Sequence, residues 1–194
     1  MRRLAALAVL ACCAFTLPSA SASAATGGTS VRTIRWAAGQ VTQLGSLRTS
    51  SSRTRAPTLS RAIAAFGRMS SRKLTSKVSC EVNWAGLGLR ATFVNLGGAL
   101  PGTTTCTPRV GKLQFATVRG HGFQTQRGLR VGDSTGRLKQ LHSGARFRQG
   151  SWWLATAPAV FGDVKPGERV PIVRAITQRG KVARFVLQIG AAGE

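Results

Sequence analysis

Only two cysteines lie beyond the first two dozen residues of this chain, and their pairing limits how it can fold. Cys80 precedes a stretch with two short turn signals, Gly97-Gly98 and Pro101-Gly102, and Cys106 follows it. In an oxidising compartment such cysteines form a disulfide, which stabilises a small exported domain by restricting its unfolded chain. We expect this bridge to tie a β-hairpin to the loop that leaves it; two free thiols are the alternative.

The first residues have the pattern of a secretory signal peptide. Two arginines precede an apolar run from Leu4 to Leu17, and small residues then offer cleavage sites after Ala22 or Ala24. We therefore predict a signal peptide at 1–24 and an exported protein that is secreted and extracellular, or associated with the cell wall. Acylation at Cys12 is the lipoprotein alternative. No later stretch has the roughly 18–20 apolar residues that cross a bilayer, so we expect no transmembrane helix in the mature chain.

The charge of the chain is strongly positive. It has 28 Lys and Arg against 5 Asp and Glu, and removing Arg2 and Arg3 from a net charge of +23 leaves +21. Such a surface attracts polyanions such as nucleic acid, anionic lipid or the phosphate polymers of a cell wall. The basic residues are scattered rather than gathered in a run, which disfavours nucleic acid as the partner. A GC-rich codon bias accounts for the same excess of arginine.

Apolar periodicity and turn residues indicate the elements of the fold. Helices are expected at 60–66, where Gly67 follows the last turn, and from Ser134 to His142. A loop is expected at 47–57. Strands are expected at 31–36, 77–84, 87–95, 113–118, 152–156, 170–177 and 182–189.

The order of these elements predicts an α+β fold. Residues 25–57 form a flexible or partly ordered N-terminal segment, and 58–194 form a single domain with halves at 58–110 and 111–194. Both halves begin with a short helix and continue as strands, which indicates two tandem helix-plus-sheet repeats. We expect an antiparallel sheet with the two short helices on one face, and the other face partly wet and available for binding.

Two stretches resemble a family of secreted actinobacterial proteins of unknown function. The first runs from Cys80 to Leu89 and continues with Phe93, Gly97-Gly98 and Cys106. The second runs from Thr125 to Ser134 and is followed by a Trp-Trp-Leu strand. The resemblance covers most of residues 58–192 and implies no known activity.

A shorter likeness links the chain to two kinds of protein-binding module. The stretch from Gly128 to Ser134, leading into a helix, is similar to the repeat opening of β-lactamase inhibitory protein and of small outer-membrane assembly lipoproteins. Ala65-Phe66-Gly67 is similar to the end of their helix, although the proline expected near Met69 is missing. This likeness implies a helix-plus-sheet fold and protein binding by analogy of fold.

Residues for catalysis are scarce. The acids of the exported chain are Glu81, Asp133, Asp163, Glu168 and Glu194, and none is spaced for a carboxylate pair. Its two histidines lack the spacing of zinc ligands. Gly-Asp-Ser at 132–134 also opens a family of serine esterases, but no histidine follows His142 to act as base, so a helix cap explains it better.

The two histidines themselves have structural interpretations. His121, which lies between two glycines, is expected in a turn, and His142 at a helix end, where a partial positive charge suits the helix dipole. We therefore predict no catalytic residue, no cofactor and no metal.

The candidate binding residues are basic and aromatic. Five arginines surround the second helix and form a candidate anion patch: Arg127, Arg130, Arg137, Arg146 and Arg148. Trp152 and Trp153 are neighbours on one strand and so point to opposite faces. One should enter the core; the other is a candidate exposed aromatic for a glycan or protein, unless the N-terminal segment covers it. Trp84 is expected in the core.

These observations favour a secreted, non-catalytic binding domain that acts at the cell envelope or outside it. Its partner is an unidentified protein or an anionic envelope polymer. An extracellular hydrolase with an unrecognised site is the alternative, and a pocket joining a histidine to Ser and Asp would favour it. Non-specific binding of polyanions or nucleic acid ranks third.

The leader predicts where the exported protein begins. N-terminal sequencing of the protein from culture medium should find Ser23 or Ala25 first. A chain that begins at Met1, or at a lipid-modified Cys12, would contradict this cleavage.

Overall fold

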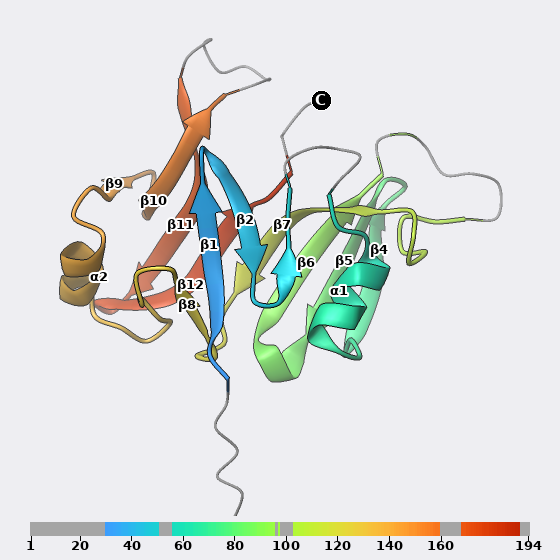
Figure 1. Cartoon of the computed structure of the whole chain (residues 1–194), viewed down its shortest axis with the longest axis horizontal. Helices are drawn as coiled ribbons and strands as arrows, with labels where there is room; N and C mark the ends of the chain where they lie inside the picture. Colours follow the sequence, from blue (N-terminus) through green and yellow to red (C-terminus); the bar gives the residue numbers. More distant parts are fainter. Residues whose placement is uncertain (1–29, 51–55, 96, 98–102, 160–167, 191–194) are drawn as a thin grey trace, which may run out of the picture.

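Two β-sheets and two short helices make up the described part of the chain. The computed structural model describes residues 30–50, 56–95, 97, 103–159 and 168–190. The leader and its cleavage sites lie outside these residues. Within them, an eight-stranded sheet forms one layer, and a four-stranded sheet and the helices lie against it (Figure 1).

The large sheet is antiparallel throughout. Its order is β4 (Ser71–Ser76), β5 (Ser79–Trp84), β6 (Leu89–Val94), β7 (Lys112–Val118), β12 (Lys181–Gln188), β11 (Arg169–Gln178), β10 (Ser151–Pro158) and β9 (Arg146–Arg148). The first four strands in this order form one meander and the last four another, and the two meet where β7 pairs with β12.

The small sheet and the helices come from segments before and between the meanders. The small sheet has the order β3 (Leu47–Arg48), β2 (Gln40–Leu44), β1 (Arg32–Ala37) and β8 (Phe123–Thr125), and β1 pairs with β8 in parallel. The α-helices are α1 (Leu59–Phe66) and α2 (Thr135–Leu141). A short 3₁₀ helix, η1 (Ala85–Leu87), lies within the first meander, between β5 and β6.

Each helix is specified by its apolar spacing and its ends. In α1, Leu59, Ala62, Ile63 and Phe66 recur at the helical period and pack against the core. The helix ends at Gly67, whose φ of +81° favours glycine. In α2, the Ser134 side chain accepts a hydrogen bond from the backbone N–H of Arg137 at 3.1 Å, which is an N-cap.

The strand register shows that both helices cover the same face of the large sheet. One row of directly paired residues crosses from β9 to β5: Phe147, Trp152, Ala175, Phe185, Val118, Leu89 and Trp84. Phe66 of α1 packs against Trp84 with ring centroids 5.5 Å apart, and the Lys139 ammonium of α2 lies 5.5 Å from the Trp152 ring. Both contacts fall on one row, so the helices share a face, and the small sheet lies between them (Figure 1).

The core fills the space under the small sheet and α1. Ile34, Val41, Leu44 and Leu47 of the small sheet are buried, as is Phe123 of β8. The N-terminal segment therefore contributes three strands to the core, where the sequence indicated one strand and a loop. Its strands are short and partly polar, so their alternation was too weak to be recognised.

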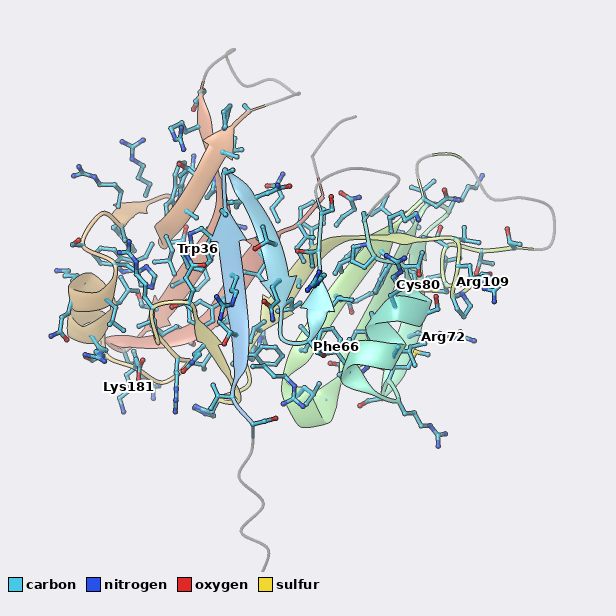
Figure 2. The ribbon with its side chains drawn as sticks, viewed as in Figure 1. Trp36, Phe66, Arg72, Cys80, Arg109 and Lys181 are labelled. Atoms are coloured by element: carbon cyan, nitrogen blue, oxygen red, sulfur yellow. A yellow bond between two sulfur atoms is a disulfide. The ribbon has the colours of Figure 1, made fainter. Side chains whose placement is uncertain are left out.

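The expected disulfide joins Cys80 to Cys106, with Cα atoms 5.1 Å apart. Cys80 is buried on β5, and the bridge fastens the segment that precedes β7 to the hairpin. Arg72 on the edge strand β4 reinforces this end of the sheet by donating to the backbone carbonyl of Cys106 at 3.4 Å. Figure 2 labels Arg72 and Cys80 at that end.

The expected α+β class is confirmed, although strands take a larger share than the sequence indicated. Both helices and the hairpins β5–β6 and β11–β12 lie where they were expected. The strands β4 and β9 were missed. They are the two edges of the large sheet and all their residues are exposed, so no buried row marked them in the sequence.

Removing the disulfide should destabilise the protein without changing its topology. The double variant Cys80→Ala/Cys106→Ala should lose about 2–5 kcal/mol of unfolding free energy, the usual cost for a small exported domain. Urea unfolding monitored by tryptophan fluorescence measures this. The reduced wild-type protein is the control and should match the double variant. Equal stabilities of the oxidised protein and the variant would contradict the prediction.

Candidate functional site

The face of the large sheet opposite the helices is the candidate functional site, and we call it the open face. A second row of directly paired residues crosses it from one edge to the other: Arg146, Trp153, Arg174, Val186, Thr117, Arg90, Asn83 and Ser71. We call this row the open row, and the row from Phe147 to Trp84 the covered row. The two rows alternate on the strands from β9 to β5, because neighbouring residues of a strand point to opposite faces.

Positive charge dominates the open face. Arg90, Arg174 and Arg146 lie in the row itself, on β6, β11 and β9. Adjacent strands are about 4.8 Å apart, so five strand steps place Arg90 and Arg146 about 24 Å from each other. Among the described residues the only ion pair joins Arg90 to Glu81 at 3.5 Å, and both side chains are well exposed. The face is therefore a positively charged track that runs across the strands.

A hollow of about 340 Å³ lies at the Arg90 end of this track, near the middle of the sheet, and we call it the central hollow. Its lining consists of Asn83, Ala85, Gly88, Leu89, Arg90, Thr117, Arg119 and Arg184. Three guanidiniums, an amide and a hydroxyl thus surround one depression. Guanidiniums bind carboxylates and phosphates through paired N–H groups, so this lining suits an oxyanion.

Two glycines hold one wall of the central hollow in place. Gly88 has a φ of +58°, and a Cβ there would lie 2.5 Å from the backbone nitrogen of Gly120. The backbone N–H of Arg119 donates to the carbonyl of Gly88 at 2.7 Å. This close approach of two backbones, which only glycine allows, positions Arg119 beside Arg90.

The five arginines of the predicted anion patch do not form one site. Arg127 donates to the Leu141 carbonyl at 3.1 Å, Arg130 to the Gln124 side chain at 3.2 Å and Arg137 to the Gln140 side chain at 2.8 Å. These three thus bond locally around α2. Arg146 and Arg148 instead line a second hollow of the open face, together with Arg169 and Trp153.

The two adjacent tryptophans point to opposite faces of the sheet. Trp152 lies in the covered row and packs against the core, beside Phe147 at a centroid distance of 5.4 Å. Trp153 lies in the open row, and the Arg148 guanidinium is 5.7 Å from its ring centroid. Trp153 is therefore the aromatic of the open face, and Trp84 is buried on the covered face.

His142 is enclosed rather than exposed at the helix end. Its Nε2 lies 3.1 Å from the hydroxyl of Thr125, and its ring stacks on Trp36 of β1 with centroids 5.8 Å apart. Burial, together with the smaller effect of the nearby Arg127 guanidinium, lowers the pKa of His142 to about 4. The prediction of a positive charge at this helix end is therefore wrong, because β1 covers the His142 ring and burial keeps the ring neutral.

Among the described residues, neither histidine forms a hydrogen bond or an ion pair with an acidic side chain. Thr125, the partner of His142, is fully buried, and its hydroxyl also accepts a hydrogen bond from the Leu129 N–H at 3.1 Å. His121 lies in an exposed turn with Nδ1 2.9 Å from the Val131 carbonyl.

In the described ranges, no three His, Cys, Asp or Glu side chains converge as metal ligands would. The helices of that same part are all too short or too polar to cross a membrane.

No protein-family model, curated protein or solved structure matches this chain. The family resemblance carried by Cys80–Leu89 and Thr125–Ser134 therefore stays a prediction.

The buried His142 makes stability depend on pH. Its pKa is about 4 when folded and about 6.5 when unfolded, so the unfolded chain binds more protons between these values. The unfolding free energy should be greatest above the unfolded pKa and should fall by up to about 3 kcal/mol as pH drops through the folded pKa. Urea unfolding between about pH 7.5 and about pH 4 measures this.

A matched pair of variants isolates the histidine responsible. His142→Gln should lack this part of the pH dependence, whereas His121→Gln should retain it. A wild-type pH profile that survives in His142→Gln would assign the dependence to other groups.

Proposed function

We propose that the protein is an exported, non-catalytic binding domain that holds an anionic polymer of the cell envelope against its open face. The observation that carries this proposal is the track of arginines across the strands, which has Glu81 as its only acidic contact among the described residues. Unpaired guanidiniums on a fixed sheet attract and orient a chain of negative charges.

The length and shape of the track favour an extended polymer over a compact partner. About 24 Å separates Arg90 from Arg146 along the strand-crossing direction, and a hollow lies near each end. Trp153 and the exposed Phe115 are the aromatic side chains identified on this face. Single-stranded nucleic acid is usually held by several stacked aromatics, so a phosphate-containing envelope polymer fits better.

The positions of the histidines support a binding role rather than hydrolysis. His142 is buried and neutral, with a fully buried threonine as its partner. A general base must reach the proton that it removes, and this ring is enclosed by β1.

The sheet topology supports the proposed tandem duplication. Helix α1 precedes the meander β4–β7, and helix α2 precedes the meander of β9–β12. We infer a repeat boundary after Val118, rather than the expected boundary between residues 110 and 111, because β7 completes the first meander. Both meanders contribute to the open face, because the central hollow takes Arg90 and Thr117 from the first and Arg184 from the second.

Salt-dependent binding tests the track. The probe is poly(glycerol phosphate), with dextran as the neutral polymer and single-stranded DNA as a further polyanion. Removing three open-face charges, in Arg119→Gln/Arg174→Gln/Arg184→Gln, should lower the affinity at least tenfold. It should also reduce the slope of log K against log salt by up to about 3, since each cation that contacts a phosphate adds about one to the slope.

Two matched triple variants separate a site from diffuse attraction. Arg48→Gln/Arg61→Gln/Arg68→Gln removes the same charge from β3, from α1 and from the turn after α1, and should change the affinity less than threefold. Arg127→Gln/Arg130→Gln/Arg137→Gln tests the patch around α2 in the same way. Equal losses in all three variants, or tighter binding of DNA than of poly(glycerol phosphate), would overturn the proposal.

A further inference from the structure

A pocket of about 230 Å³ at the β10 end of the open face has the chemistry of a ligand site. We call it the bulge pocket. Its lining is Gly144, Arg146, Arg148, Trp153, Leu154, Ala155, Thr156 and Arg169. It belongs to the second meander and does not share a lining residue with the central hollow.

A β-bulge builds this pocket. Trp153 pairs with Arg174 but Ala155 pairs with Val173, so β10 carries one extra residue between them. In a regular strand, residues three apart point to opposite faces. The extra residue resets the alternation, and Trp153 and Thr156 therefore line the same pocket. Bulges commonly re-aim side chains next to functional sites.

Two of its three guanidiniums are held in place by the protein. The Nε of Arg169 donates to the Thr156 hydroxyl at 2.7 Å, and its Nη2 donates to the Thr156 carbonyl at 3.0 Å. The Arg148 guanidinium lies 5.7 Å from the Trp153 ring centroid in a cation–π contact. Side chains ordered in advance lose less conformational entropy when they bind a ligand.

The indole of Trp153 offers a further, unmet hydrogen bond. Its Nε1 is buried and has no acceptor among the described residues. Buried polar groups are almost always paired, and an unpaired N–H is costly. The lining of the bulge pocket thus includes a tryptophan whose indole N–H has no acceptor among the described residues.

We propose that the bulge pocket binds a phosphate ester, with the three arginines around the phosphate and Trp153 beside its organic group. A phosphate monoester presents three terminal oxygens in a tetrahedral array, whereas a carboxylate presents two in one plane. Three guanidiniums that converge from β9 and β11 therefore match phosphate better. This inference rests on the proposed function and deepens it, because a phosphate-containing polymer carries a monoester where a phosphate ends the chain, whereas its internal phosphates are diesters.

Binding of small ligands to the exported protein tests the pocket apart from the track. The probes are glucose 6-phosphate, inorganic phosphate, glucuronate and glucose, titrated at about 0.15 M salt, where weak long-range attraction is screened. Calorimetry gives the affinity and tryptophan fluorescence reports on Trp153. Glucose 6-phosphate should bind with a dissociation constant below about 1 mM, at least threefold tighter than inorganic phosphate and tenfold tighter than glucuronate.

Variants inside and outside the pocket assign the site. Arg169→Gln and Arg146→Gln should each lower the affinity for glucose 6-phosphate at least tenfold, because each removes charge-assisted hydrogen bonds. Thr156→Val keeps the shape of the side chain but frees Arg169, and should weaken binding severalfold. Trp153→Phe should abolish most of the fluorescence change. Arg184→Gln in the central hollow is the matched control and should leave this affinity unchanged.

Three outcomes would overturn the inference. They are equal affinity in Arg169→Gln and Arg184→Gln, glucuronate binding as tightly as glucose 6-phosphate, and no binding of any phosphate while the protein still binds poly(glycerol phosphate). The last result would leave the open-face track intact. If the protein binds glucose 6-phosphate but not poly(glycerol phosphate), the proposed function is overturned and the inference about the bulge pocket stands.

Discussion

The rest of this structure depends on the burial of one face of a continuous eight-stranded sheet. A sheet of this size must bury one face to be stable, and here α1, the small sheet and α2 together cover it. The cover is assembled from three separate stretches of chain, including the N-terminal strands. Because all of them lie on the same side, no helix or strand of the described residues covers the opposite side. The open face is thus a consequence of how the core is closed.

The charge distribution follows the same division. The covered row is apolar from Phe147 to Trp84, whereas the open row carries arginine on three of its strands. Long arginine side chains can lie along a sheet with their head groups in water, so they are compatible with a folded face. With few acids in the chain, the arginines gain little from internal ion pairs. Asp133, for example, accepts a backbone bond from Arg130 at 2.7 Å instead of pairing with a neighbouring guanidinium. An external anion is therefore the natural complement of this face.

The long, regular elements could be predicted because each carries a buried row at its own period. The hairpin β11–β12 shows this, since Arg184 and Val186 alternate with the buried Phe185 and Leu187. The edge strands β4 and β9 could not be predicted in this way, because an edge strand that is exposed on both sides has no apolar period. His142 was misjudged for a related reason: the β1 strand that buries it lies about a hundred residues away in sequence.

The sequence by itself determined the disulfide, the α+β class, the scarcity of catalytic groups and the excess of positive charge, because each of these depends on residue type and local spacing. It also named Arg146, Arg148 and Trp153 as candidates, but it assigned the two arginines to a patch around the second helix. Only the tertiary structure decided which arginines lie together. Arg90, Arg119 and Arg184 meet because β6, β7 and β12 are neighbours in the sheet, and a bulge in β10 turns Trp153 and Thr156 to one side. Strand order and register are long-range choices of the whole chain, so a local pattern cannot contain them.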